Sequence, residues 1–274
     1  MTKPKYPTLR EICNTHASKR EYERYLPLSR YVFRPLGFLA TWLAIRLGLT
    51  SETVSWISGF VALIGCLCLM DSREQLLLIG VSLLILFNLL DCVDGSMARA
   101  MKTENPYGSF LDSVMALVDM GLWAIIGIMA YRHPQLLYWP NPFDKGEIVW
   151  LITGGITCYF YNLVSYIEGA FDRLLREGVN KLFNKSEPEI SIGNVAENRN
   201  DSLFFIRNII RRINHNLRVR ETYLFLLVLA FFGRAVDLLL IFFLFYYVLH
   251  TTLLVFIYCR RGRQLRKSHL QEPL

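Results

Sequence analysis

The sequence predicts an all-α integral membrane protein in which six transmembrane helices follow an N-terminal amphipathic interfacial helix. Three observations lead to this prediction: the composition, the length of the apolar runs and the positions of the basic residues. Of the 274 residues, 53% are hydrophobic, and they include 18 Phe, 14 Tyr and 5 Trp. An ordinary soluble domain carries fewer apolar residues, so the composition favours a membrane protein.

Four apolar runs are each long enough for one membrane crossing. A hydrocarbon core of about 30 Å needs about 20 mostly apolar residues in a helix. The runs that meet this length are residues 52–70, 75–98, 108–131 and 148–170.

A further apolar stretch, residues 222–259, is too long for a single crossing. Gly233, Arg234 and Asp237 interrupt it. We therefore expect two helices joined by a short turn, which brings the number of crossings to six.

The basic residues place both chain termini on one side of the membrane, as six crossings require. This side holds 26 of the 30 Lys and Arg residues, and the opposite side keeps only Arg73, Arg132, Lys145 and Arg234. Cytosolic loops are enriched in Lys and Arg, so both termini are predicted to be cytosolic. The net charge of +7 is thus explained by membrane topology, and no nucleic acid is expected as a partner because no basic recognition motif is found.

The predicted crossings divide the chain into three parts. Residues 1–50 form a cytosolic N-terminal segment, in which residues 27–47 mix Arg with aromatic residues at helical spacing. This mixture is typical of a helix in the headgroup layer, whereas a crossing helix there would reverse the charge bias. Residues 51–259 form the membrane domain, including a polar cytosolic loop at 171–221, and residues 260–274 form a basic cytosolic tail.

Three carboxylates stand at the cytosolic ends of the second and third predicted crossings. Residues 91–99 read DCVDGSMAR, and residues 107–112 read YGSFLD. Asp91 and Asp94 are three positions apart and share a helix face, while Asp112 begins a helix that can pack antiparallel to the first. Ionised carboxylates are unfavourable in a membrane helix, so we expect a cation to compensate them. Hard oxygen ligands from two helices suit magnesium or manganese.

The residues around these carboxylates are suited to a diphosphate. Gly95, Ala98 and Gly108 lie on or near the same face, and their small side chains leave space for a nucleotide against the backbone. Arg99 adds a fixed positive charge for phosphate. The alternative, that the acids only solvate helix ends, does not explain the joint spacing of Gly, Ala and Arg.

The spacing resembles the signature of the CDP-alcohol phosphotransferases, also called CDP-alcohol phosphatidyltransferases. That signature reads DxxDGxxAR, then seven or eight residues, then GxxxDxxxD. The sequence supplies every fixed position except the last, namely Asp91, Asp94, Gly95, Ala98, Arg99, Gly108 and Asp112. Residues 50–55, TSETVS, are similar to the TPNxVT opening of the family's first helix, with Ser51 and Glu52 in place of Pro and Asn.

The resemblance implies an enzyme that transfers a phosphoalcohol or phosphatidyl group from a CDP-linked donor to a hydroxyl acceptor and releases CMP. The donor is CDP-diacylglycerol or a soluble CDP-alcohol, and the reaction serves phospholipid or surface-glycolipid synthesis at a cytosolic active site. Asp91, Asp94 and Asp112 would bind metal. The CDP moiety would contact Gly95, Ala98, Arg99, Gly108 and Ser55. The family is commonly dimeric, so a homodimer in the lipid bilayer is expected.

The sequence departs from the signature at Ala116, where the family has an aspartate that acts as base for the acceptor and as ligand of a second metal. Three explanations are open. In the first, the alanine is an introduced substitution that inactivates the enzyme to trap a complex. In the second, the natural protein uses another base, one metal or an acceptor that is already acidic. In the third, the protein binds CDP compounds or forms a scaffold without catalysis.

Asp119 is the candidate substitute for the missing base. It follows Asp112 by seven residues, on a similar helix face but about 10 Å deeper at 1.5 Å per residue. A second role, hydrogen bonding within the helix bundle, is also open for Asp119, as it is for Asn162 and His250.

The end of the fourth predicted crossing bears on the acceptor. Family members that take phosphorylated polyols have SY followed by basic residues there, whereas here Ser165 and Tyr166 precede Glu168. This difference argues against an acceptor that carries a phosphate, although Arg173 and Arg176 lie about one turn later. A transporter, the alternative from another class, would distribute its acids through the bilayer depth rather than at one face.

Overall fold

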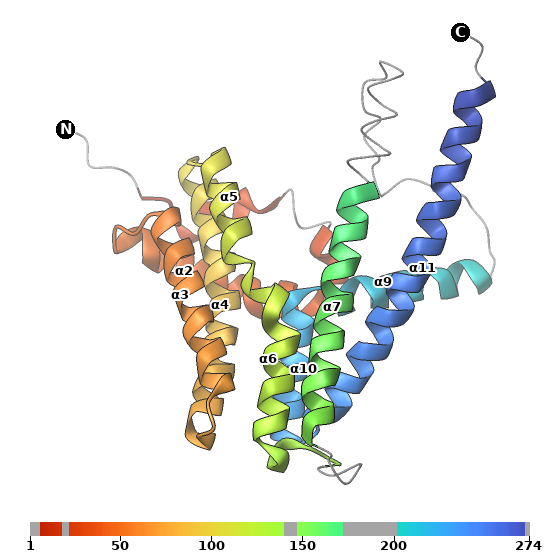
Figure 1. Cartoon of the computed structure of the whole chain (residues 1–274). Coiled ribbons are helices and arrows are strands. Elements are labelled where there is room, and N and C mark those ends of the chain that lie inside the picture. Colours follow the sequence, from red (N-terminus) through yellow and green to blue (C-terminus); the bar gives the residue numbers. More distant parts are fainter. Residues whose placement is uncertain (1–5, 18–21, 140–146, 172–201, 272–274) are drawn as a thin grey trace.

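The computed structural model describes residues 6–17, 22–139, 147–171 and 202–271, and within these ranges it contains helices and no strand (Figure 1). The helices in chain order are α1 (Leu9–Thr15), α2 (Arg34–Arg46), α3 (Ser51–Met70), α4 (Glu74–Met101), α5 (Pro106–Met115), α6 (Val118–Arg132), α7 (Glu147–Phe171), α9 (Ser202–Leu217), α10 (Arg220–Phe232) and α11 (Val236–Gln271). Short 3₁₀ or π-helical turns are η2 (Tyr22–Tyr25), η3 (Ser29–Phe33) and η4 (Pro134–Leu136).

Five helical segments are long and apolar enough to cross a membrane, so the chain is a multi-pass integral membrane protein. They are Ser51–Met70, Glu74–Met101, Pro106–Arg132, Ile148–Phe171 and Val236–Arg263. They correspond to the four single crossings predicted and to the second half of the long apolar stretch. Along α3, the outward face exposes the large apolar side chains Trp56, Phe60, Leu63 and Leu67, as lipid contact requires.

The sixth predicted crossing is the short helix α10. The interruption expected in the long apolar stretch is confirmed: α10 ends at Phe232, Arg234 has left-handed backbone with φ of 51°, and α11 begins at Val236. The 13 residues of α10 extend about 20 Å, less than the hydrocarbon core, so a crossing by α10 stays a prediction. α11 continues to Gln271, so the segment predicted as a tail after Cys259 begins as a helix.

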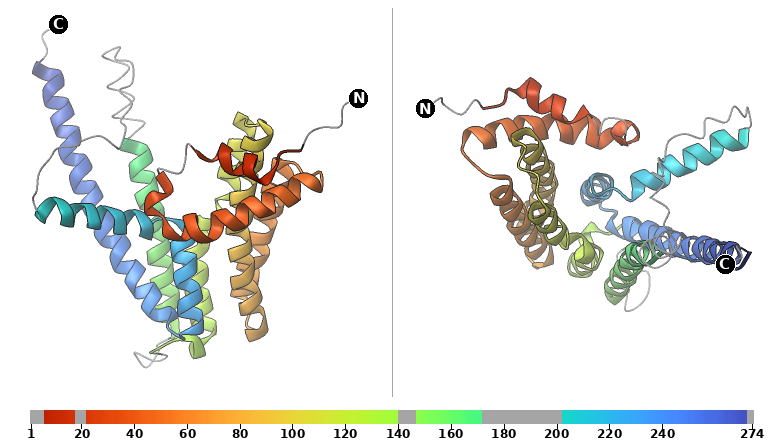
Figure 2. Two further views of the ribbon diagram at one scale, coloured as in Figure 1. Left: turned by 180° about the vertical axis from the view of Figure 1, so that it is seen from behind. Right: turned by 90° about the horizontal axis from the view of Figure 1, so that it is seen from above.

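The N-terminal helices lie across the axis of the bundle, and α9 crosses the axis at a similar level (Figure 2). η3 and α2 occupy the stretch predicted as the interfacial helix. α1 and α2 pack on α4 through a small core. The free face of α2 exposes leucines at helical spacing, which a helix in the headgroup layer would insert between acyl chains: Leu36, Leu39, Leu43 and Leu47.

The main core lies among α3, α4, α6, α7, α10 and α11. Its centre is the fully buried Trp123 of α6. The ring centroid of Trp123 lies 5.8 Å from that of Tyr223, 4.4 Å from that of Phe243 and 5.8 Å from that of Tyr247. These aromatic contacts fix α10 against α6 and α11, and they thereby position the first turn of α10 beside the aspartate-bearing part of α4.

Small residues let neighbouring helices touch through their backbones. A Cβ atom on Gly154 of α7 would lie 2.6 Å from the Cα of Gly127 in α6. In the same way, a Cβ on Gly80 of α4 would lie 2.9 Å from the carbonyl oxygen of Gly65 in α3. No side chain fits at these crossings, which is the packing expected of helices in a membrane.

Polar contacts hold the end of the bundle that is remote from Asp91, Asp94 and Asp112. Asp237 is fully buried and accepts the backbone N–H groups of Tyr138 at 2.9 Å and Trp139 at 2.8 Å. His133 Nε2 lies 2.8 Å from the carbonyl oxygen of Asp71. The side chains of Asp237 and His133 are thus paired with the connecting segments, which ties these helix ends together.

The third predicted crossing, residues 108–131, is two helices rather than one. α5 ends at Met115 and α6 begins at Val118, with a visible offset between them (Figure 1). The N–H of Leu117 bonds the carbonyl of Val114 at 3.1 Å, a spacing of three residues that tightens the backbone and interrupts the α-helical ladder. The interruption falls at the position where the signature loses its last aspartate.

Gly154→Ala is expected to lower the free energy of unfolding by roughly 1–3 kcal/mol, because the new methyl group must push α6 and α7 apart. Gly155→Ala is the matched control, since a Cβ there meets no atom within 4 Å. Thermal unfolding of both variants in the same detergent measures the difference. Equal midpoints would contradict the close approach of the two helices.

Candidate functional site

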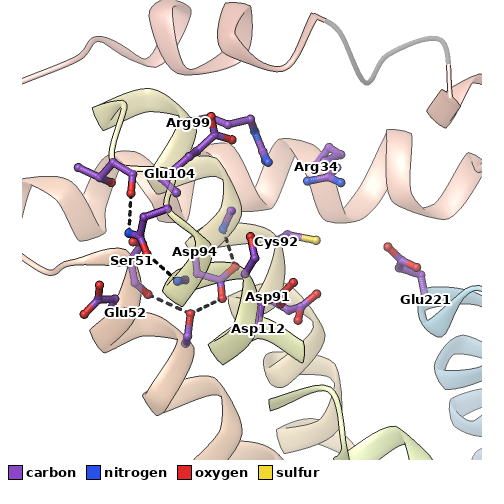
Figure 3. Close-up of a pocket in the computed structure, with 17 residues that line it drawn as sticks. Arg34, Ser51, Glu52, Asp91, Cys92, Asp94, Arg99, Glu104, Asp112 and Glu221 are labelled. Carbon is purple, nitrogen blue, oxygen red and sulfur yellow. Dashed lines mark hydrogen bonds between the residues drawn. The ribbon is translucent and has the colours of Figure 1, made fainter. Parts of the chain in front are cut away.

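A cavity of about 360 Å³ lies between the N-terminal ends of α3 and α5 and the aspartate-bearing part of α4 (Figure 3). Arg34 of α2 and Glu221 of α10 complete its wall. Ala116 and Asp119 are not among its lining residues. The other predicted site residues all line it: Ser55, Asp91, Asp94, Gly95, Ala98, Arg99, Gly108 and Asp112.

The short connection between α4 and α5 brings the two helix ends together. α4 ends at Met101, and Lys102 takes a left-handed conformation with φ of 56°, which terminates the helix. Asn105 then caps α5, because its side-chain oxygen accepts the N–H of Gly108 at 2.7 Å. The chain therefore reverses within a few residues, and Asp112 returns to the cavity beside α4.

Acidic side chains dominate the cavity. Its two guanidinium groups are those of Arg34 and Arg99. Its carboxylates are those of Glu52, Asp91, Asp94, Glu104, Asp112 and Glu221. This excess of hard, negatively charged oxygens suits a divalent cation such as magnesium.

The ligand geometry for such a cation is not preformed. Among the described residues, no three His, Cys, Asp or Glu side chains are arranged so that they could hold a metal ion. Asp91, Asp94 and Asp112 share the cavity, where Asp91 pairs with Arg220 and Asp94 accepts the hydroxyl of Ser55. The donor chemistry therefore fits a divalent cation, and the carboxylates would have to adjust to converge on it.

The carboxylate of Asp94 is held from two directions. Asp94 is buried, and its Oδ2 accepts the hydroxyl of Ser55 at 2.6 Å. Its Oδ1 accepts the backbone N–H of Gly95. Ser55, which the resemblance assigned to the nucleotide, thus contacts Asp94 and fixes the α3 wall against α4.

Arg220 of α10 connects two acidic residues from different helices. Its Nη1 lies 3.0 Å from Oδ1 of Asp91 in α4, and its Nε donates to Oδ2 of Asp119 in α6 at 2.7 Å. The guanidinium also stacks over the ring of Phe87, 4.6 Å from its centroid. Sequence reasoning placed Arg220 only in a basic loop, because its acidic partners are more than 100 residues away along the chain.

These contacts bear on the residues for which a bundle role was left open. Asp119 faces α10 and is paired, which supports hydrogen bonding within the bundle rather than action in the cavity. Asn162 donates to the carbonyl of Met120 at 2.9 Å, and His250 stacks on Tyr246. Neither Asn162 nor His250 lines the cavity.

Ala116 caps the C-terminus of α5, where its N–H bonds the carbonyl of Asp112 at 3.0 Å. It stands one turn after Asp112, at the break between α5 and α6. The cavity therefore has no carboxylate at the signature position of the base.

Arg34 is a cavity residue that the sequence did not identify. Its Nη2 lies 2.7 Å from Oε1 of the buried Glu23, whose Oε2 lies 2.8 Å from Nε2 of His16. The buried Nε atoms of Arg34 and Arg99 have no hydrogen-bond partner in the described structure. Two guanidinium groups with unused donors beside one cavity suit an anionic ligand.

Glu221 is the second residue that sequence reasoning missed. It stands at the start of a long apolar run. Because acidic residues are favourable in the first turn of a helix, a glutamate there does not by itself indicate a functional site. The charge pattern of residues 27–47 similarly predicted a helix but not which arginine faces inward. In both cases only the packing of the helices assigns the side chain to the cavity.

Residues 48–166 match the family model of the CDP-alcohol phosphatidyltransferases. The matched segment, a little under half of the chain, contains the aspartates of α4 and α5 and ends within α7. It confirms the resemblance drawn from the signature, and the family is one of enzymes that act on CDP-linked substrates and generally depend on a metal. A search of the curated proteins found no match.

Arg220→Gln is expected to lower the free energy of unfolding by up to roughly 3–5 kcal/mol, because two partly buried carboxylates lose the cation that they share. Arg218→Gln is the control. Arg218 pairs with Glu168, but the two side chains are 33% and 29% exposed, so this pair contributes under about 1 kcal/mol. Unfolding in detergent measures the loss of stability in both variants. Equal losses would contradict the larger stabilisation expected from the Arg220 contacts. Arg173 and Arg176, which bear on the same helix end, lie outside the described residues.

Folding stability is expected to fall as the pH drops below about 6.5 because of His16. Burial, and secondarily the charge of Arg34, lowers the pKa of His16 below its ordinary value of 6.5, although Glu23 opposes the shift. The unfolded chain then binds a proton at a higher pH than the folded chain. The stability is fully present above pH 6.5 and is lost toward the folded-state pKa. Thermal midpoints at pH 7.5 and 5.5 should differ less in His16→Gln, and parallel curves would refute this role.

Proposed function

We propose that the protein is a CDP-alcohol phosphotransferase that moves a phosphoalcohol or phosphatidyl group from a CDP-linked donor to a hydroxyl acceptor and releases CMP. The observation that carries this proposal is the meeting of Asp91, Asp94 and Asp112 from two helices at one cavity, within the segment that matches the family. Arg99 lines the same cavity, as the signature requires. The charge distribution favours a cytosolic position for the cavity and both termini, and the family favours a homodimer.

Residues from several walls of the cavity would bind the donor. A magnesium or manganese ion bound to Asp91, Asp94 and Asp112 would neutralise charge on the diphosphate and assist departure of CMP. Arg99 supplies a fixed charge to the phosphates, and Arg34 is placed to add a second. Gly95 and Ala98 leave the surface of α4 open to the nucleotide.

The reaction exchanges one phosphorus–oxygen bond for another. The acceptor oxygen forms a bond to the phosphorus farther from cytidine, and the bond from that phosphorus to the oxygen of CMP breaks. CMP leaves with the electron pair, and the acceptor proton passes to a base. Because the donor or the acceptor is a lipid, a cavity at the ends of membrane helices suits either arrangement.

A non-catalytic protein that binds CDP compounds is the second candidate. Ala116 favours it, because a methyl group can neither accept a proton nor bind a metal. The two candidates agree on binding and differ only in turnover.

Release of labelled CMP from CDP-diacylglycerol or CDP-alcohols, by membranes containing the protein and magnesium, tests the proposal. Asp112→Asn is expected to reduce turnover by roughly 100-fold or more, because the cavity loses a charge that acts on the transition state. Ser113→Ala is the control on the same helix, since its exposed hydroxyl bonds only the carbonyl of Ser109. CDP binding without turnover would favour the non-catalytic candidate, and absence of both would contradict the assignment.

A further inference from the structure

The proposed reaction needs a group that takes the proton of the acceptor hydroxyl, and the expected position does not supply one. Ala116 has no basic atom. Asp119 is absent from the cavity lining and is paired with Arg220 at 2.7 Å. The base must therefore be sought among the carboxylates that line the cavity.

Only one of these carboxylates is both free of the proposed metal set and withdrawn from the surface. Asp91, Asp94 and Asp112 are the proposed metal ligands. Glu52, in the first turn of α3, and Glu104, in the turn between α4 and α5, are exposed residues at the rim. The remaining carboxylate belongs to Glu221, which is half-buried.

Glu221 reaches the cavity from a separate wall. Figure 3 shows it on the side opposite Ser51 and Glu52, on the same side as Arg34, with Asp91 and Asp112 between the two walls. If the nucleotide binds along α4 and the start of α5, the side of the cavity at Glu221 stays open for the acceptor.

The position of Glu221 is fixed by its neighbour in the chain. Arg220 is bound to Asp91 at 3.0 Å and to Asp119 at 2.7 Å, so the first turn of α10 is fastened to α4 and α6. The guanidinium of Arg220 is committed to those carboxylates. Within the described part of the chain, Glu221 makes no ion pair within 4 Å, and its carboxylate accepts its own backbone N–H, so no cation competes with a ligand there.

We propose that Glu221 is the catalytic base of the transfer, in place of the aspartate that is missing at position 116. This assignment rests on the proposed function. As the acceptor oxygen bonds to phosphorus, its proton moves to the carboxylate of Glu221, and CMP departs with the electrons of the broken phosphorus–oxygen bond. The protonated Glu221 then returns the proton to water through the cavity mouth. The transferred group and the acceptor oxygen end in one product, so atoms and charges balance.

Four forms of the full-length protein test the assignment: the chain itself, Glu221→Gln, Ala116→Asp, and the double variant Ala116→Asp/Glu221→Gln. CMP release from the labelled donor measures turnover, while CDP binding and the thermal midpoint measure the integrity of the site. Glu168→Gln is the control for the loss of an acid that does not line the cavity.

If Glu221 is the base, Glu221→Gln loses roughly 10²- to 10⁴-fold in turnover, the range of general base catalysis, while CDP affinity and thermal midpoint stay near those of the parent. The double variant regains turnover, because the aspartate at position 116 restores a base. Glu221→Asp keeps part of the activity. If Glu221→Gln does not fold, the contrast between Glu221→Asp and Ala116→Asp/Glu221→Asp carries the same test.

Four results would overturn the assignment. Full turnover in Glu221→Gln would show that another group takes the proton while the proposed function stands. Turnover that appears only with aspartate at position 116, whatever residue is at 221, would restore the signature position as the sole base. Loss of CDP affinity in Glu221→Gln in parallel with turnover would make Glu221 a structural residue. If none of the four forms binds CDP or releases CMP, the proposed function itself fails, and the assignment fails with it.

Discussion

The contact of Arg220 with Asp91 and Asp119 is the interaction on which the cavity depends. It joins α10, α4 and α6, three helices that are distant in the sequence, at the place where the cavity wall must be continuous. Removing three charged groups from water is unfavourable, and only close geometry with several hydrogen bonds offsets that cost. The planar guanidinium lies between the two carboxylates: its Nε donates to Asp119, its Nη1 lies 3.0 Å from Asp91, and it stacks on Phe87. The aromatic cluster around Trp123 supports the contact by fixing α10 from its other side.

The cavity is completed by residues that the matched segment does not contain. Residues 48–166 provide α3 to α6 and most of α7, and with them the aspartates. Arg34 comes from the helix before that segment and Glu221 from a helix after it. Each is positioned by a partly buried ion pair, Glu23 with Arg34 on one side and Asp91 with Arg220 on the other. The aspartates of the signature and the two residues outside the matched segment, Arg34 and Glu221, therefore lie on different walls of the cavity.

The sequence was sufficient for the parts of the structure that depend on local pattern. Apolar runs predicted six crossings, five of which coincide with helices long and apolar enough to span a membrane, and the Gly233–Arg234 interruption predicted the turn before α11. The signature predicted a shared site for Gly95 and Asp112, the likeness of residues 50–55 added Ser55, and all three line the cavity. What it could not supply depends on packing between distant segments. The pairing of Asp119 with Arg220 joins residues about 100 positions apart, so the sequence alone left Asp119 as a candidate base. The break at Ala116 arises from backbone hydrogen bonds, and no proline or glycine at that position indicates it in the sequence.

The leucine row on α2 has a consequence for how a lipid substrate would reach the cavity under the proposed function. A helix with such a row settles where water gives way to hydrocarbon, and the same helix carries Arg34 into the cavity. The position of α2 in the headgroup layer would then fix the depth of the cavity relative to the bilayer surface. Under the proposed function, a lipid substrate would enter laterally while its acyl chains stay in the bilayer, and the soluble substrate would enter from the aqueous side. The two would then meet at the membrane surface without either leaving its own phase.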